Sequence, residues 1–122
     1  MAKNILIVDD SQIVLDMIGF IISSAGYKVF AATGGLEALE IMNRHDIDMA
    51  FVDINMPGMD GYTLIEKIRA DRDFCDVPVI IISTESQAAD KRRGFDAGAN
   101  GYLVKPVPPE ELIAQIRLLT GE

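Results

Sequence analysis

Short apolar runs alternate five times with longer segments in which apolar residues recur at helical spacing. The short runs are typical of buried strands, and the longer segments are typical of amphipathic helices. The predicted strands are 5–8, 27–32, 49–53, 77–83 and 101–104, and the predicted helices are 11–25, 36–44, 62–71, 86–97 and 109–119. Five strand–helix units in succession predict an α/β fold, with a parallel sheet, right-handed crossovers and helices on both faces.

The first two predicted helices each present an apolar face to the expected core. In the second of them, Leu36 and Leu39 are predicted to point inward, with Met42 as a further candidate. The inner face of the first is predicted from five residues at helical spacing: Val14, Ile18, Ile21, Ile22 and Ala25. Ile13 and Phe20 extend the apolar surface beyond that face, which indicates either a contact site or cover by a neighbouring helix or loop.

Composition limits the class of protein. The 122 residues suit one domain, taken as residues 1–122. The formal net charge of -8 argues against direct binding to nucleic acid, and Lys91-Arg92-Arg93 is the only basic run. Because no apolar run approaches the roughly 18 residues of a membrane span and no signal peptide is evident, we expect a cytoplasmic protein without membrane contact. The lone Cys75 fits a reducing compartment.

Chemically active side chains follow four of the five predicted strands. The first, third, fourth and fifth strands lead into acids, hydroxyls or a lysine: Asp9 and Asp10, Asp53, Ser83 and Thr84, and Lys105. The carboxyl ends of parallel strands open onto one edge of a sheet, so these side chains are expected to lie together. Carboxylates, a hydroxyl and an ammonium group at one edge favour a phosphate and metal site.

A flavodoxin-like strand order, 2-1-3-4-5, would make the first and third strands neighbours about 4.8 Å apart. Asp10 and Asp53 would then nearly touch, and Asp9 would add a third negative charge. Such a cluster needs a cation or a shared proton, and a ligand set made only of oxygens suits Mg²⁺. Taken singly, Asp10 or Ser83 could instead cap a helix, and Lys105 could be an ordinary surface lysine.

Four blocks of sequence resemble a known family. They are Val8–Asp10, Val52–Gly61, Ile82–Thr84 and Gly98–Pro106. In this order and at this spacing, they make the chain similar to a CheY-like receiver domain of bacterial response regulators, from the first strand to the last helix. The resemblance implies a doubly wound (βα)5 flavodoxin-like fold and a phospho-accepting signalling switch of a two-component phosphorelay.

The resemblance also implies the chemistry of the site. Asp53 would accept a phosphoryl group from a sensor histidine kinase or a histidine phosphotransfer protein. Lys105 would contact the phosphoryl oxygens, and the Lys105–Pro106 peptide bond would be cis. Mg²⁺ would be bound by Asp10, Asp53 and the backbone carbonyl of Asn55, while Asp9 would hold the ion through water. Such a domain catalyses its own phosphorylation and dephosphorylation and is not a turnover enzyme on other substrates.

Phosphorylation of Asp53 would add charge and acceptor oxygens, to which a nearby hydroxyl responds. Ser83, 22 positions before Lys105, matches the hydroxyl that switches in the family, and Thr84 is the alternative. Tyr102 would turn into the space that Ser83 vacates. The surface formed by the fourth helix, fifth strand and fifth helix would then change for an unknown downstream protein.

Two pairs of residues are expected to govern how the phosphoryl group arrives and leaves. Asn55 and Glu85 stand two positions after Asp53 and Ser83, where they can border the path of water and tune dephosphorylation. Ile13 and Phe20 could form an apolar seat for the helices that present the donor histidine.

Other functions remain as alternatives. A phosphatase with an aspartate nucleophile would need Asp-x-Asp after a strand, and an FMN carrier would need a first loop rich in Ser, Thr and Gly; neither pattern is present. A constitutive scaffold of receiver type would lack phosphorylation. The chain could also be the excised receiver of a transcription factor, although Asn100-Gly101 replaces the two acids of receivers that dimerise in winged-helix regulators.

Overall fold

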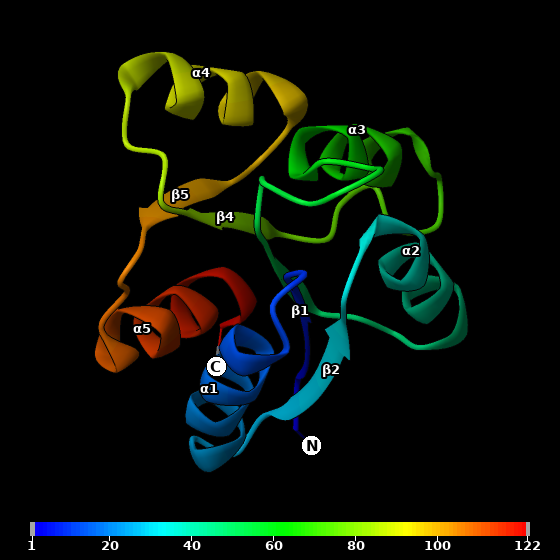
Figure 1. Ribbon diagram of the computed structural model, residues 1–122. Helices are drawn as coiled ribbons and strands as arrows, with labels where there is room; N and C mark the ends of the chain where they lie inside the picture. The colour runs from blue at the N-terminus through cyan, green and yellow to red at the C-terminus, as the bar shows by residue number, and fades with distance from the viewer. Residues whose placement is uncertain (1, 122) are drawn as a thin grey trace.

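The computed structural model describes residues 2–121 as a regular alternation of strands and helices (Figure 1). The elements in chain order are β1 (Asn4–Val8), α1 (Gln12–Ser24), β2 (Lys28–Ala32), α2 (Gly35–Arg44), β3 (Met49–Val52), α3 (Gly61–Ala70), β4 (Val79–Ser83), α4 (Ala88–Ala97), β5 (Gly101–Val104) and α5 (Pro109–Thr120). Each predicted strand and helix is therefore present, with ends that differ by at most two residues from the prediction.

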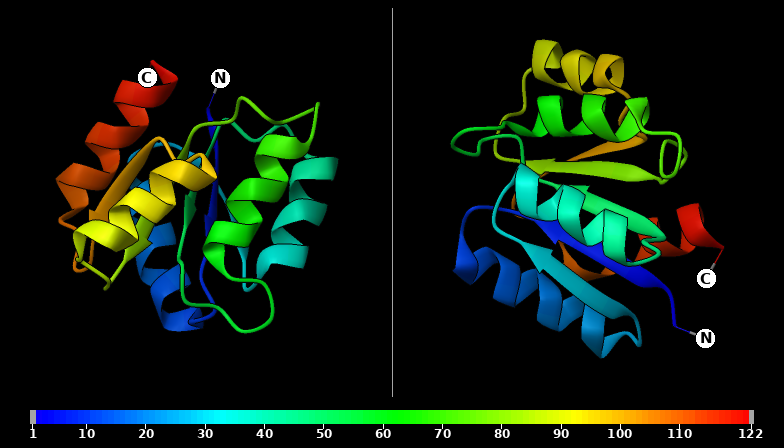
Figure 2. Two further views of the ribbon diagram at one scale, coloured as in Figure 1. Left: turned by 90° about the horizontal axis from the view of Figure 1, so that it is seen from above. Right: turned by 90° about the vertical axis from the view of Figure 1, so that its right-hand side faces the viewer.

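The five strands form one parallel sheet in the order β2-β1-β3-β4-β5, which confirms the predicted topology. Helices α1 and α5 cover one face, and α2, α3 and α4 cover the other (Figure 2). In the register of the central strands, Ile5 lies opposite both Val29 and Met49. Because β1 and β3 are neighbours, the residues that follow them leave the sheet at the same point.

The core has two layers because successive side chains of a strand point to opposite faces. Leu6 and Val8 of β1 join the layer under α2 and α3, while Ile5 and Ile7 join the layer under α1 and α5. Strands β3 and β4 are buried over their whole length, as expected for central strands of a parallel sheet.

The helix ends are set by local sequence. The side chain of Ser11 accepts a hydrogen bond from the backbone N–H of Val14 and caps α1, and Asp60 does the same for Thr63 at the start of α3. Gly98 ends α4 at φ 117°, a left-handed conformation that favours glycine. Pro109 occupies the first turn of α5, where its missing N–H is no loss.

The rotation of two helices differs from the prediction. Leu36 was expected to point inward but is 72% exposed, because α2 turns Gly35, Ala38 and Met42 toward the core. Gly35 lies against the side chain of Met59 and leaves no room for a Cβ atom. In α1 the prediction is confirmed for Ile18, Ile21 and Ile22, which pack in the core layer. Leu15, which was not predicted, is buried, and Ala25 is exposed.

Gly94 allows α4 to pack closely on the sheet. A Cβ atom at this position would lie 2.6 Å from Cδ1 of Ile81 and 3.3 Å from Cδ2 of Tyr102. The glycine lowers helix propensity, as its position in the sequence indicates, but it also lets the helix axis approach β4 and β5.

Arg69 fixes the corner of the fold at the amino-terminal ends of β4 and β5. Its Nε donates to the carbonyl of Gly98 at 2.9 Å, and its Nη1 donates to the carbonyls of Cys75 at 2.9 Å and Val77 at 2.7 Å. Its Nη2 donates to Oδ1 of Asn100 at 2.7 Å. These bonds join the end of α3 to the turn between α4 and β5.

No helix among residues 2–121 has the length and hydropathy to cross a membrane.

Candidate functional site

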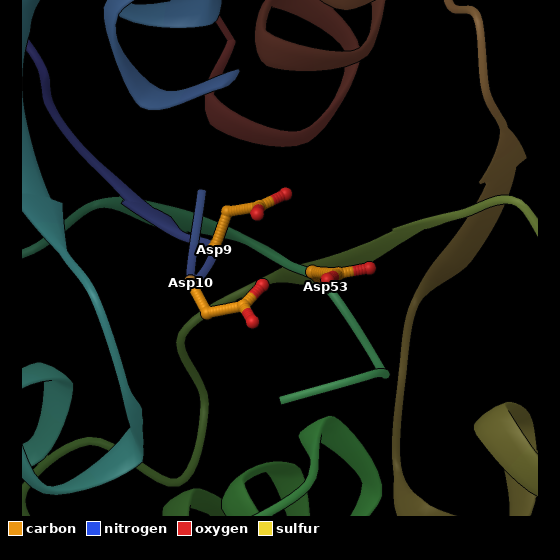
Figure 3. A group of neighbouring side chains, drawn as sticks. All are labelled: Asp9, Asp10 and Asp53. Atoms are coloured by element: carbon orange, nitrogen blue, oxygen red, sulfur yellow. The ribbon is translucent and has the colours of Figure 1, made fainter. Parts of the chain in front are cut away.

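Three carboxylates meet where β1 and β3 end, as the sequence predicts (Figure 3). Asp9 and Asp10 follow β1, and Asp53 follows β3, where its N–H donates to the carbonyl of Val8 at 2.9 Å and continues the ladder between the two strands. One oxygen from each carboxylate lies within 4.8 Å of the other two. Asp9 and Asp53 are buried, and Asp10 is exposed.

Lys105 brings a cation to this cluster. Its N–H donates to the carbonyl of Ser83 at 2.8 Å, which extends the pairing of β4 with β5 up to the site. Its Nζ lies 2.9 Å from Oδ2 of Asp9 and 3.6 Å from Oδ1 of Asp53. The Lys105–Pro106 peptide bond is cis, in agreement with the expectation. The ammonium group thus bridges two of the three acids and leaves the cluster with a net negative charge.

The electrostatics of Asp53 favour a bound cation. Burial raises the pKa of its carboxyl group above the ordinary value, and Asp9 and Asp10 add to that rise, while Lys105 opposes it. A positive ion beside the three carboxylates would relieve both the repulsion and the cost of burial. The donor set consists only of carboxylate oxygens, which suits a hard divalent metal ion.

The loop after Asp53 folds tightly back on the end of β3. The carbonyl of Ile54 accepts hydrogen bonds from the N–H groups of Met56 at 3.1 Å and Gly61 at 2.9 Å. Gly61 lies directly against the backbone of Asp53 and Ile54, so a side chain at this position would collide with it. This turn leaves Asn55 exposed at the rim of the site.

Glu85 connects the predicted switch residues. The Oγ of Ser83, which is fully buried, accepts the N–H of Glu85 at 3.0 Å, and the hydroxyl of Tyr102 donates to the carbonyl of Glu85 at 2.8 Å. Nδ2 of Asn55 donates to Oε1 of Glu85 at 3.4 Å. Thr84, the alternative to Ser83, is exposed. The sequence placed Glu85 at the rim, but its backbone contacts to both switch residues follow only from the structure.

Ile13 and Phe20 are 73% and 74% exposed, so neither is covered by a neighbouring helix or loop. Met17, one helical turn from each, is 61% exposed and extends the apolar strip; the prediction missed it. Beside this strip lies an apolar cavity of about 380 Å³ between α1 and α5, with Pro106 and Val107 in its wall. The free flank of α1 is therefore an apolar surface next to the carboxylates.

Comparison with known proteins gives the family. Residues 5–117 match the family model described as the response regulator receiver domain. The chain therefore belongs to the response regulator receiver family, the signalling modules of two-component systems, as its site and strand order indicate.

The chain is similar to proteins from several organisms. It is 35% identical over 116 residues to the DNA-binding dual master transcriptional regulator RpaA of Synechocystis sp., covering 95% of this chain and 48% of that protein. It shares 32% identity with the chemotaxis protein CheY4 of Vibrio cholerae, with a TM-score of 0.93 and coverage of 98% and 99% of the two chains. The chain spans about half the length of the curated relatives it matches.

One similar structure contains a metal ion. The receiver domain of the sensor histidine kinase PA1611 from Pseudomonas aeruginosa PAO1 holds a magnesium ion in its active-site cleft. It is 29% identical to this chain over the full length of both, with a TM-score of 0.92.

Replacing one acid of the cluster should stabilise the metal-free domain. Asp10→Asn is expected to raise the free energy of unfolding by up to about 1 kcal/mol, since two unit charges about 4 Å apart in water repel by that amount. Chemical denaturation in the presence of a chelator measures the difference. Glu66→Gln, the same change of charge on the exposed face of α3, serves as the control. A lower stability of Asp10→Asn without metal would contradict the repulsion.

The same variant tests the metal site. A divalent ion at ten times its dissociation constant should stabilise the wild type by about 1.4 kcal/mol by mass action. Asp10→Asn should lose most of that gain, and Glu66→Gln should keep it. An equal gain in all three proteins would place the ion elsewhere.

Proposed function

We propose that this domain accepts a phosphoryl group on Asp53 from a phosphohistidine of a sensor histidine kinase or a histidine phosphotransfer protein. The observation that carries the proposal is the placement of a buried carboxylate beside two further acids and 3.6 Å from the ammonium group of Lys105. A carboxylate oxygen of Asp53 attacks phosphorus, the P–O bond forms, and the P–N bond breaks. The departing imidazole takes a proton from solvent and no group changes its oxidation state.

The residues around Asp53 supply positioning and charge, which suffices for phosphoryl transfer. Asp9, Asp10 and Asp53, with the backbone carbonyl of Asn55, would hold Mg²⁺. The ion, when bound, neutralises charge on the phosphoryl oxygens and orients them for in-line attack. The magnesium ion of the similar PA1611 receiver supports this choice of metal. The ammonium group of Lys105 contacts Asp9 and Asp53. It would exchange these carboxylates for an oxygen of the incoming phosphoryl group.

The contacts of Glu85 support a route by which phosphorylation of Asp53 would change the surface of the domain. The hydroxyl of Ser83 would donate to a phosphoryl oxygen on Asp53 and withdraw from the N–H of Glu85. The carbonyl of Glu85, which accepts the hydroxyl of Tyr102, moves with it. Tyr102 then shifts beneath α4, and the surface of α4, β5 and α5 changes for a downstream protein.

Hydrolysis of the aspartyl phosphate would return the domain to its starting state. The domain then catalyses its own phosphorylation and dephosphorylation and has no other substrate. A scaffold that never takes a phosphoryl group is the alternative, which the retained acids, hydroxyl and lysine disfavour.

The chain could serve as the receiver part of a longer transcriptional regulator, since it spans about half of relatives such as RpaA. Dimerising receivers of that class use acids where this chain has Asn100-Gly101. Oδ1 of Asn100 accepts the N–H of Val79 at 2.9 Å and Nη2 of Arg69 at 2.7 Å. The side chain is thus engaged inside the fold, which favours a receiver that signals without this intersubunit contact.

The phosphoacceptor is tested by Asp53→Asn. The variant should fold with unchanged circular dichroism but take no phosphoryl group from acetyl phosphate and Mg²⁺, as measured by mass spectrometry of the intact protein. Asp16→Asn, on the exposed face of α1, should be labelled like the wild type. A stable phosphoryl group on Asp53→Asn would transfer the acceptor role to another residue.

The lifetime of the phosphoryl group should depend on the rim of the site. Glu85→Lys reverses the charge of the side chain and removes its contact with Asn55, but it does not alter the backbone groups that contact Ser83 and Tyr102. We expect the rate of spontaneous dephosphorylation to change about tenfold, equivalent to about 1.4 kcal/mol in the barrier, and the rate of phosphorylation by acetyl phosphate to change less. Asn55→Met should act in the same way, while Glu66→Lys serves as a control. Equal effects on both rates would indicate a general disturbance of the site.

The exposed apolar strip of α1, formed by Ile13, Met17 and Phe20, is expected to bind the kinase that carries the donor phosphohistidine. Ile13→Lys and Phe20→Asp should each slow transfer from the cognate kinase by tenfold or more and leave labelling by acetyl phosphate near normal. Leu36→Lys changes an equally exposed apolar residue on the opposite face of the sheet and should transfer normally. If both donors are slowed to the same extent, or neither is, this flank does not bind the kinase.

A further inference from the structure

Tyr62 connects α3 to the amino-terminal half of α4. It is the second residue of α3 and is 5% exposed, although its position near a helix start requires no aromatic side chain. Its hydroxyl donates to the carbonyl of Asp90 at 3.2 Å, and the guanidinium of Arg93 lies 4.2 Å from the centre of its ring. Helices α3 and α4 lie side by side in both views of Figure 2. One side chain thus makes a hydrogen bond and a cation–π contact to the neighbouring helix.

Two tyrosine hydroxyls hold the segment that leads into α4. Tyr102 donates to the carbonyl of Glu85, and Tyr62 donates to the carbonyl of Asp90. Burial raises the pKa of both phenols, and the proximity of Tyr102 adds to the rise at Tyr62. The exposed residues from Ser86 to Ala89 lie between these two points of attachment.

Tyr62 is also directly linked to the phosphoacceptor loop. It follows Gly61, whose N–H donates to the carbonyl of Ile54, the residue after Asp53. Tyr62, Asp90 and Arg93 line a polar cavity of about 350 Å³ together with Asn55 and Glu85 at the rim of the site. A displacement of the loop therefore reaches α4 through Tyr62 without passing through Ser83.

We propose that Tyr62 is a second positioning residue of the switch, which holds the amino-terminal half of α4 and couples it to the loop after Asp53, in parallel with Ser83 and Tyr102. The holding contact rests on the geometry alone. The coupling rests on the proposed phosphorylation of Asp53. The hydroxyl donates a hydrogen bond to the backbone of α4, and the ring makes the cation–π contact with Arg93.

Hydrogen exchange read by mass spectrometry tests both parts. Tyr62→Phe removes only the hydroxyl, so exchange of peptides spanning 86–94 in the unphosphorylated protein should be about fivefold faster, equivalent to roughly 1 kcal/mol. Arg93→Met should have an effect of similar size on the same peptides. Tyr27→Phe, which removes a hydroxyl from a half-buried tyrosine on the other face of the sheet, should leave them unchanged.

Coupling is read by repeating the measurement after labelling with acetyl phosphate and Mg²⁺. The single variant Tyr102→Phe should retain part of the phosphorylation-induced change in exchange of peptides 86–94. The double variant Tyr62→Phe with Tyr102→Phe should show no such change, although its labelling yield should equal that of the wild type. Unchanged exchange in unphosphorylated Tyr62→Phe, or a uniform increase over the whole fold, overturns the holding role. A full phosphorylation-induced change in the double variant overturns the coupling. If the wild-type protein takes no phosphoryl group, the proposed function and the coupling are both overturned. Hydrogen exchange in the unphosphorylated samples then still tests whether Tyr62 holds α4.

Discussion

The crowding of three carboxylates at the ends of β1 and β3 is the constraint on which the rest of the structure depends. The parallel sheet places Asp9, Asp10 and Asp53 within 4.8 Å of one another, and burial of Asp53 prevents water from fully screening them. Lys105 offsets part of this charge from the end of β5. The strand order thus places the acids on the neighbouring strands β1 and β3, and the next two strands, β4 and β5, bring a hydroxyl and an ammonium group to them.

Short backbone contacts connect the edge of this site to β5. The loop that follows β4 is attached to buried Ser83 through the N–H of Glu85, and the carbonyl of the same residue holds Tyr102. Glu85 itself is exposed, so its position depends on these hydrogen bonds rather than on apolar burial. A loop held in this way can be displaced at a modest cost in free energy, whereas β3 and β4 beneath it are fully buried and rigid.

The strand order came from the resemblance to receiver domains. The helix boundaries and the gathering of the acids could be predicted because they depend on local pattern and on the geometry of parallel sheets. The rotation of α2 could not, since Leu36 and Ala38 are both acceptable apolar residues and the contact of Gly35 with Met59 decides between them. The same limit applies to Tyr62 and Glu85. The backbone carbonyls of Asp90 and Glu85 accept the hydroxyls of Tyr62 and Tyr102, which lie 28 and 17 positions away, and a backbone carbonyl carries no signature in the sequence.

Arg69 has a mechanical consequence for α4. Its Nε bond to the carbonyl of Gly98 and its Nη2 bond to Asn100 pin the carboxyl-terminal end of that helix, while the amino-terminal end is held by tyrosine hydroxyls. A rod fixed at one end responds to a push at the other by tilting as a lever rather than by sliding. Ten residues of α-helix are about 15 Å long, so a tilt of about 4° carries the amino-terminal end through about 1 Å. With its pivot at Gly98, a small displacement of the amino-terminal end of α4 would thus become a graded displacement along the outer face of the domain.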